Sequence, residues 1–133
     1  MINKQPTAIV IDDTWENQLI FTSILKKLNV VTESYTDSTQ GLEALSTKTY
    51  DLMILDLSMP KISGNQILKK IRPGEFHKKM KIVVVTAYAH MAIGQDIDEG
   101  ADYLMLKPIS VPDFTRFLTK VLPKQIDTIN NTP

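Results

Sequence analysis

Short runs of consecutive apolar residues alternate along the chain with longer amphipathic stretches. The runs lie at residues 8–11, 30–31 with Tyr35, 52–55, 82–85 and 103–106. Three of them are apolar at consecutive rather than alternate positions, which is typical of strands buried on both faces of a parallel sheet. The pattern therefore predicts five strands.

The stretches between the runs carry the spacing of amphipathic helices. The last helix is the most clearly marked, because Ser110 can cap it and Asp113 stands at its third position. The helix around residues 90–98 is weakly marked, since Gly94 costs about 1 kcal/mol relative to alanine. The apolar positions that mark the other helices and the last one are Ile20, Phe21, Ile24, Leu25 and Leu28; Leu42 and Leu45; Ile67, Leu68 and Ile71, stopped by Pro73-Gly74; and Val111, Phe114, Phe117, Leu118, Val121 and Leu122.

Five strand–helix pairs in this order predict an α/β fold. Right-handed crossovers give a doubly wound, five-stranded parallel sheet with five helices on its two faces. The 133 residues suit one domain, which we place at residues 1–124, followed by a polar C-terminal tail at 125–133.

Composition narrows the class of protein. Fifteen basic and fifteen acidic residues give zero formal charge, so we expect no direct contact with nucleic acid or membrane. The chain contains no cysteine, its N-terminus lacks the apolar region of a signal peptide, and no apolar run approaches the length of a membrane span. We therefore expect a soluble cytoplasmic protein.

Polar residues directly follow four of the five apolar runs. They are Asp12 and Asp13, Asp56, Thr86 and Lys107. Because ligands of such sheets bind beyond the carboxyl ends of the strands, these side chains should converge on one edge.

Three carboxylates on one edge repel each other. A pair near 4 Å costs about 4 kcal/mol at an effective dielectric near 20, so either a proton or a cation must join them. Oxygen ligands without His or Cys suit Mg²⁺ or Mn²⁺. Lys107 and the Thr86 hydroxyl add donors beside that cation, which predicts a place for a phosphoryl group.

Each residue also has a purely structural interpretation when taken alone. Asp13 could cap the first helix, with Glu16 three residues on. Asp56 could simply end a strand, Thr86 could cap a helix, and Lys107 could be a solvated lysine. It is their combination that favours a functional site.

The same residues carry a family resemblance. The pattern resembles the receiver domain of two-component response regulators over residues 7–122. The matching motifs are Asp12-Asp13, Asp56 with Met59-Pro60, Gly64, Thr86-Ala87, Gly100-Ala101 and Lys107-Pro108. The resemblance implies a flavodoxin-like sheet of strand order 2-1-3-4-5 and a cis peptide at Lys107-Pro108.

The resemblance also implies a role for each site residue. Asp56 would be the phosphoacceptor. Asp13, Asp56 and the backbone carbonyl of Ser58 would bind Mg²⁺ directly, and Asp12 would hold it through water. Lys107 would pair with the phosphoryl oxygens, and Thr86 would move to hydrogen-bond one of them.

These roles imply a signalling protein rather than an enzyme, with at most an intrinsic autophosphatase activity. A sensor histidine kinase or phosphotransfer protein would supply the phosphoryl group. A stand-alone regulator of this kind, monomer or weak dimer, would signal to an unknown target protein by contact or by phosphorelay. Its output surface would be the fourth helix, fifth strand and fifth helix.

The sequence departs from the family at the position three before Lys107. An aromatic residue is usual there, but this chain has Leu104, and Tyr103 should point to the opposite face of the strand. Tyr88 lies two residues after Thr86, and we expect it either to shield the acyl phosphate from water or merely to pack on the fourth helix.

Three rival functions remain open at this point. A haloacid-dehalogenase-like phosphatase needs a second aspartate where this chain has Ser58. A flavodoxin needs a phosphate loop rich in Ser, Thr and Gly after the first strand, where this chain has DDTWEN. A degenerate receiver would dock partners without being phosphorylated.

Two further features stand apart from the site. Trp15, the only tryptophan, is expected to be exposed at the start of the first helix, near enough to report on the site. A cluster of basic residues precedes the fourth strand, and zero net charge favours a solvated loop over a nucleic-acid patch. Its members are Lys69, Lys70, Arg72, His77, Lys78, Lys79 and Lys81.

Overall fold

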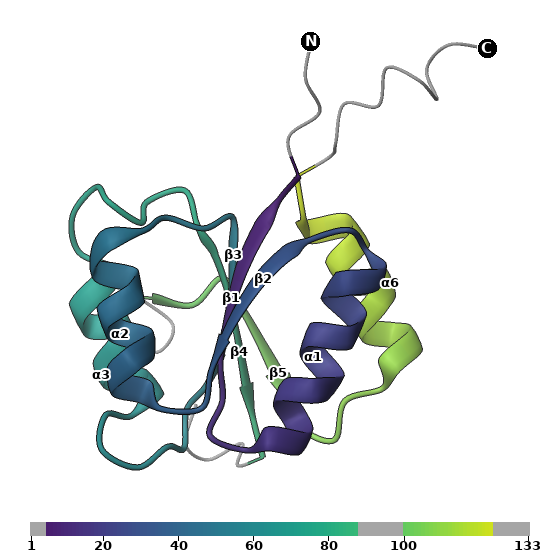
Figure 1. The fold of residues 1–133 in the computed structure, drawn as a ribbon, viewed down its shortest axis with the longest axis horizontal. Coiled ribbons are helices and arrows are strands. Elements are labelled where there is room, and N and C mark those ends of the chain that lie inside the picture. The colour runs from purple at the N-terminus through teal and green to yellow at the C-terminus, as the bar shows by residue number, and fades with distance from the viewer. Residues whose placement is uncertain (1–4, 88–99, 124–133) are drawn as a thin grey trace, which may run out of the picture.

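The computed structural model describes residues 5–87 and 100–123 and shows a five-stranded parallel sheet between two layers of helices (Figure 1). The strand order is β2-β1-β3-β4-β5, as expected. The elements in chain order are β1 (Thr7–Ile11), α1 (Trp15–Lys27), β2 (Val31–Tyr35), α2 (Ser38–Thr47), β3 (Leu52–Asp56), α3 (Gly64–Ile71), β4 (Lys81–Thr86), β5 (Tyr103–Leu106) and α6 (Val111–Val121).

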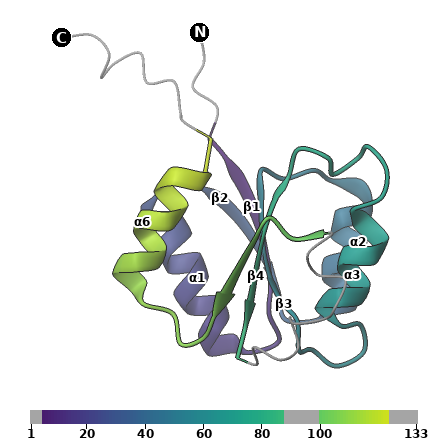
Figure 2. The same ribbon diagram turned by 180° about the vertical axis from the view of Figure 1, so that it is seen from behind.

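Helices cover both faces of the sheet. α1 and α6 lie on one face and α2 and α3 on the other, as the front and back views show (Figures 1 and 2). These are the four helices of the described residues. The expected helix around residues 90–98, Tyr88 and the expected tail at 125–133 lie outside the described residues. No described helix is long and apolar enough to cross a bilayer.

The central strands are buried on both faces, which confirms the interpretation of their consecutive apolar residues. Alternate residues of β1 point to opposite sides of the sheet. Ile9 and Ile11 pack with α2 and α3, whereas Ala8 and Val10 pack with α1 and α6. On the face covered by α1 and α6, the ring centroids of Phe21 and Phe114 lie 5.4 Å apart and join the two helices.

Two predicted helix-end signals are confirmed, namely Ser110 at the start of α6 and Pro73-Gly74 after the end of α3. Ser63 and Gln66 form a capping box at the start of α3, and Ser110 accepts a hydrogen bond from the Asp113 amide at the start of α6. Two expectations at the helices are wrong. Val111, expected in the buried stripe, is exposed in the first turn of α6, and Ile20 is exposed on the outer side of α1.

The expected cap of the first helix is also wrong. Asp13 does not cap α1, whose N-cap is Thr14 without a side-chain cap bond. Instead, Oδ1 of Asp12 accepts a hydrogen bond from the Thr14 amide at 2.9 Å. Because Asp12 holds the turn, the helix begins one residue later than expected and Asp13 is left exposed beside it.

Gly64 lets α3 start directly against the end of β3. A Cβ atom at this position would lie 2.4 Å from the carbonyl oxygen of Asp56 and 2.8 Å from Cα of Leu57. Both neighbours are backbone atoms, which cannot rotate away as a side chain can. The Gly64 amide also donates a hydrogen bond to the Leu57 carbonyl at 3.0 Å. The absence of a side chain here therefore sets the position of the Asp56 backbone.

Gly64→Ala is expected to lower the free energy of unfolding by about 1–3 kcal/mol, because the added methyl group forces the backbone apart. Urea unfolding followed by circular dichroism would measure the loss. Lys70→Ala, on the exposed side of the same helix, is the matched control and should change stability little. Equal stability of the Gly64 variant and wild type would contradict the close packing.

Candidate metal and phosphoryl site

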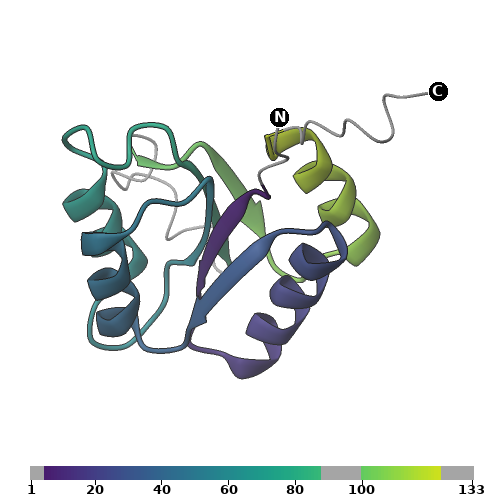
Figure 3. The same ribbon diagram turned by 45° about the horizontal axis from the view of Figure 1, so that its top comes forward.

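Four neighbouring strands deliver polar side chains to one edge of the sheet. Asp12 follows β1, Asp56 ends β3, Thr86 ends β4, and Lys107 follows β5. These strands are neighbours in the sheet, so residues distant in sequence meet at its carboxyl edge. Figure 3 shows how the twisted strands run between the helix layers towards that edge. The expected convergence is therefore confirmed.

Asp12, Asp13 and Asp56 form an acidic cluster. Each offers a carboxylate oxygen, and these atoms all lie within 4.8 Å of one another. Asp12 and Asp56 are 1% and 4% exposed, whereas Asp13 is exposed. Two of the three charges thus have little water to solvate them, and a cation approaching through solvent would meet Asp13.

Lys107 is the cation that faces this cluster in the structure. Its Nζ lies 3.2 Å from Oδ2 of Asp12 and 3.7 Å from Oδ2 of Asp56. The Lys107 amide donates a hydrogen bond to the Thr86 carbonyl at 2.8 Å, which ties the end of β5 to the end of β4. Lys107-Pro108 is a cis peptide, as the resemblance implied. One ammonium group therefore serves two buried carboxylates.

The pKa of the Asp56 carboxyl is raised from its usual 3.8 to about 6, and burial is the largest cause. The negative charge of Asp12 contributes to this rise, and that of Asp13 contributes less. The Lys107 ammonium and the Ser58 amide lower the pKa, the latter as a donor to Oδ1 at 3.2 Å. Desolvation and the neighbouring carboxylates thus raise the pKa of Asp56 more than Lys107 lowers it. The three carboxylates carry more negative charge than one ammonium group neutralises.

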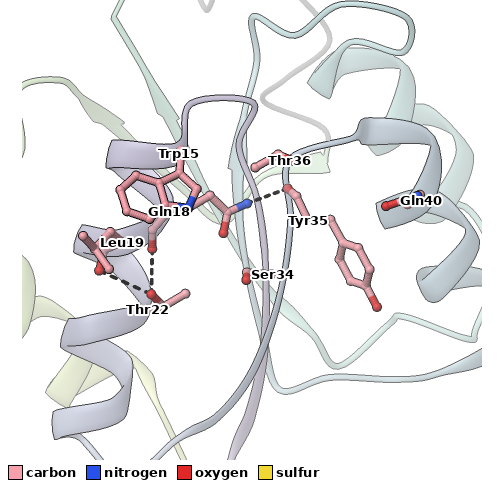
Figure 4. Close-up of a pocket in the computed structure, with 8 residues that line it drawn as sticks. All are labelled: Trp15, Gln18, Leu19, Thr22, Ser34, Tyr35, Thr36 and Gln40. Carbon is pink, nitrogen blue, oxygen red and sulfur yellow. Dashed lines mark hydrogen bonds between the residues drawn. The ribbon is translucent and has the colours of Figure 1, made fainter.

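Gln18 was missed in the sequence, yet its side chain holds this edge together. It is only 6% exposed. Its Nε2 donates to the backbone carbonyls of Tyr35 at 2.5 Å and of Asp12 at 3.1 Å, which joins the ends of β2 and β1 (Figure 4). A glutamine on an amphipathic helix gives no signal of such a role, because the carbonyls it binds belong to two other elements.

A pocket of about 230 Å³ opens beside Gln18, between α1 and the end of β2 (Figure 4). Trp15 forms part of its wall and is 67% exposed, as expected. Thr22 and Ser34 also line the pocket, and Thr22 Oγ1 donates back to the Gln18 carbonyl at 2.8 Å. Trp15 lies two residues after Asp13 in the sequence.

The structure places the remaining expected residues as follows. Thr86 is completely buried at the end of β4. Ser58 contacts Asp56 through its amide, and the role of its carbonyl as a metal ligand stays a prediction. The Tyr103 ring packs edge-on against Phe117 of α6 at 5.0 Å, so Tyr103 does point away from the face occupied by Leu104, which is 46% exposed.

Fold and site together define a flavodoxin-like α/β protein with an acidic cluster and a lysine at the carboxyl edge of its sheet. Residues 8–119 match the family model of the response regulator receiver domain. The chain therefore belongs to this family, whose members are phosphoacceptors that bind Mg²⁺ at an acidic pocket and interact with histidine kinases and phosphotransfer proteins.

Known proteins of the family are similar over nearly the whole chain. The two-component response regulator ORR11 of Oryza sativa is 25% identical over 120 residues, which cover 89% of this chain and 82% of that protein. Sporulation initiation phosphotransferase F of Bacillus subtilis is 23% identical and is covered over 97% of its length by 92% of this chain.

Solved structures give the same result. The response regulator TrrA of Thermotoga maritima, in complex with Mg²⁺ and BeF, matches with a TM-score of 0.78 and 25% identity, over 89% of this chain and 100% of that one. The chemotaxis response regulator CheY4 of Vibrio cholerae matches with a TM-score of 0.80 over 90% of this chain and 100% of its own. At 20% identity, the latter shows the shared fold.

Asp56→Asn is expected to raise the free energy of unfolding of the metal-free protein by about 2 kcal/mol at neutral to alkaline pH. The folded wild type has the higher pKa, so its stability falls as pH rises from about 4 through about 6, where the buried carboxyl ionises. The asparagine does not titrate, so the gain should vanish below that window. Urea unfolding in EDTA at several pH values measures it.

The control for this prediction is Asp113→Asn, which removes an exposed carboxylate that is not part of the acidic cluster. It should shift stability by no more than about 0.5 kcal/mol, without the same pH window. An Asp56→Asn variant no more stable than wild type at alkaline pH would show that burial of this charge is not costly.

Proposed function

We propose that this chain is a stand-alone response regulator that accepts a phosphoryl group on Asp56 in a Mg²⁺-dependent reaction. The observation that carries the proposal is the convergence of three carboxylates within 4.8 Å of one another, with Lys107 3.7 Å from Asp56. A structural role for these residues would not require two buried carboxylates to share one ammonium group.

The residues at the carboxyl edge fit a hard divalent cation. The donor set is made of carboxylate oxygens, contains no sulfur or imidazole, and carries surplus negative charge, which suits Mg²⁺ or Mn²⁺. Asp13, Asp56 and the Ser58 carbonyl would hold the ion directly, and Asp12 through water. When bound, Mg²⁺ offsets the charge of the carboxylates and of the phosphoryl oxygens.

Asp56 is the proposed nucleophile. A carboxylate oxygen of Asp56 forms a bond to phosphorus, while the bond between phosphorus and the histidine nitrogen of the donor breaks and the imidazole leaves with its electron pair. Asp56 must be ionised to attack, and with a pKa of about 6 it is mostly ionised at neutral pH. The backbone at Ser58 and Gly64 keeps this side chain at the edge of the sheet.

Lys107 and Thr86 complete the proposed chemistry. Lys107 already lies between Asp12 and Asp56, so its ammonium can pair with a phosphoryl oxygen attached to Asp56 after a small movement. Thr86 ends the neighbouring strand β4 on the same edge, and its hydroxyl would donate a hydrogen bond to a second phosphoryl oxygen. Hydrolysis of the acyl phosphate by water would be the limit of any autophosphatase activity.

The proposed phosphodonor is a histidine kinase or a phosphotransfer protein. A hybrid signal transduction histidine kinase of Dictyostelium discoideum contains a region 27% identical to 91% of this chain. Sporulation initiation phosphotransferase F supports the stand-alone form, because that whole protein is little longer than the matched region. Its name describes a phosphotransferase, which supports a phosphorelay. Contact with a target protein is the proposed output.

The proposed output surface includes β5 and the start of α6. Leu104, Leu106 and Val111 are each about half exposed there. Exposed aliphatic side chains on adjoining elements suit a protein partner. The region between β4 and β5, which would complete this surface, lies outside the described residues. Cytoplasmic location and a monomer or weak dimer remain part of the proposal.

Incubation with acetyl phosphate and Mg²⁺ tests the proposed reaction. Wild type is expected to gain the mass of one phosphoryl group in intact-protein mass spectrometry. Asp56→Asn should gain none, and Asp51→Asn, at the other end of the same strand, should still be modified. EDTA should abolish the gain. No phosphorylation of folded wild type by acetyl phosphate or by a panel of purified kinases would favour a docking module instead.

Asp13→Ala is expected to weaken Mg²⁺ binding by about tenfold or more, because it removes a direct oxygen ligand. Trp15 fluorescence during Mg²⁺ titration provides the measurement, since the only tryptophan lies two residues after Asp13. Glu16→Ala, which removes an exposed carboxylate in the first turn of α1, is the control and should bind normally. Unchanged affinity of the Asp13 variant would show that Asp13 is not a direct ligand.

A further inference from the structure

The basic segment between α3 and β4 has no part in the proposed phosphoryl chemistry. Residues 69–81 contain six of the fifteen basic residues and one of the fifteen acidic ones. They run from the end of α3 to the start of β4, so they lie at the end of the sheet opposite the acidic cluster (Figures 1 and 3). Because the chain as a whole has zero formal charge, the rest of it is acidic.

Two members of this basic segment point inwards and hold the loop in shape. The Arg72 guanidinium donates to the carbonyls of His77 at 3.1 Å and Met80 at 3.0 Å, and to Oδ2 of Asp102 at 2.6 Å. His77 is 3% exposed, and its Nε2 lies 2.7 Å from the Leu45 carbonyl. The loop is therefore anchored to α2, to its own backbone and to the start of β5.

The side chains that this segment leaves exposed combine one aromatic residue with several lysines. We call them the basic loop surface, which consists of Lys70, Phe76, Lys78, Lys79 and Lys81, all of them exposed. Phe76 is 54% exposed, and one side of its ring is fixed edge-on to the buried His77 ring at 4.7 Å. Glu75, which pairs with Lys78 at 3.6 Å, cancels one of the four lysine charges, so the surface stays basic.

We propose that the basic loop surface binds a short acidic segment of a partner protein that also carries an apolar side chain. The lysines would pair with its carboxylates, and the exposed face of Phe76 would contact the apolar side chain. An anchored loop loses little conformational entropy on binding, so an aromatic presented in this way is suited to recognition. The site is separate from the proposed phosphoacceptor, and the two can fail independently.

Three observations favour an acidic protein segment over a nucleic acid. Arg72, the only arginine in the segment, is already bonded to three oxygen atoms and has no free fork for a phosphate or a base. Phe76 is the only aromatic residue of the basic loop surface, whereas single strands stack on several. A long polyanion would also run onto the acidic remainder of the chain, while a short segment would not.

A dye-labelled peptide of alternating Glu and Asp with one central Leu tests the proposal by fluorescence anisotropy at near-physiological salt. Wild type should bind it saturably. The double variant Lys78→Glu/Lys79→Glu should bind about tenfold or more weakly, and Phe76→Ala about threefold or more weakly. The matched control Lys26→Glu/Lys27→Glu makes the same charge change in the last turn of α1 and should bind as wild type does.

Circular dichroism and urea unfolding would establish that each variant is folded before its affinity is compared. The proposal is overturned if wild type does not bind the peptide, or if the α1 control loses as much affinity as the loop variant. Tighter binding to duplex DNA or to phosphatidylserine vesicles than to the peptide would also overturn it, in favour of a nucleic acid or a membrane surface. An unchanged affinity of Phe76→Ala would remove the apolar contact from the proposal.

Discussion

The mutual repulsion of carboxylates at the ends of β1 and β3 is the constraint to which the rest of the site responds. Asp12 and Asp56 are almost completely buried, and Lys107 faces both of them. At about 4 Å and an effective dielectric near 20, one such pair repels by about 4 kcal/mol. A fold keeps this arrangement only if its core is stable enough to offset the repulsion. The strands buried on both faces provide that stability.

Specific contacts also hold the backbone beside the carboxylates in place. Gly64 allows α3 to begin in contact with the Asp56 backbone, and Gln18 ties the carbonyl that follows β1 to the one that ends β2. Both residues act on main-chain atoms and neither bears a charge. They fix the backbone beside the carboxylates, so the repulsion is not relieved by a rearrangement of the main chain.

The two ends of the sheet differ in charge and in chemistry. The carboxyl edge gathers carboxylates around one lysine, and the opposite end carries lysines around Phe76. Zero net charge conceals this separation, because it sums the charges of the whole chain. A protein that exchanges a phosphoryl group at one end and contacts partners elsewhere gains from such a division, since a partner on the basic loop surface would leave the acidic edge accessible.

The sequence alone was enough to predict the five strands, the burial of the central three on both faces and the residues at the carboxyl edge. These depend on local periodicity and on one general property of parallel sheets, that their carboxyl ends share an edge. Tertiary structure decided the rest. In the folded chain, Asp13 is exposed and does not cap α1. Gln18 and His77 are buried, and Arg72 points inwards. The tertiary structure also brought Lys107 to Asp12, 95 positions away, and buried Asp56 beside Asp12, which raises the pKa of Asp56. Burial and electrostatic fields depend on neighbours from distant segments, and no local pattern records them.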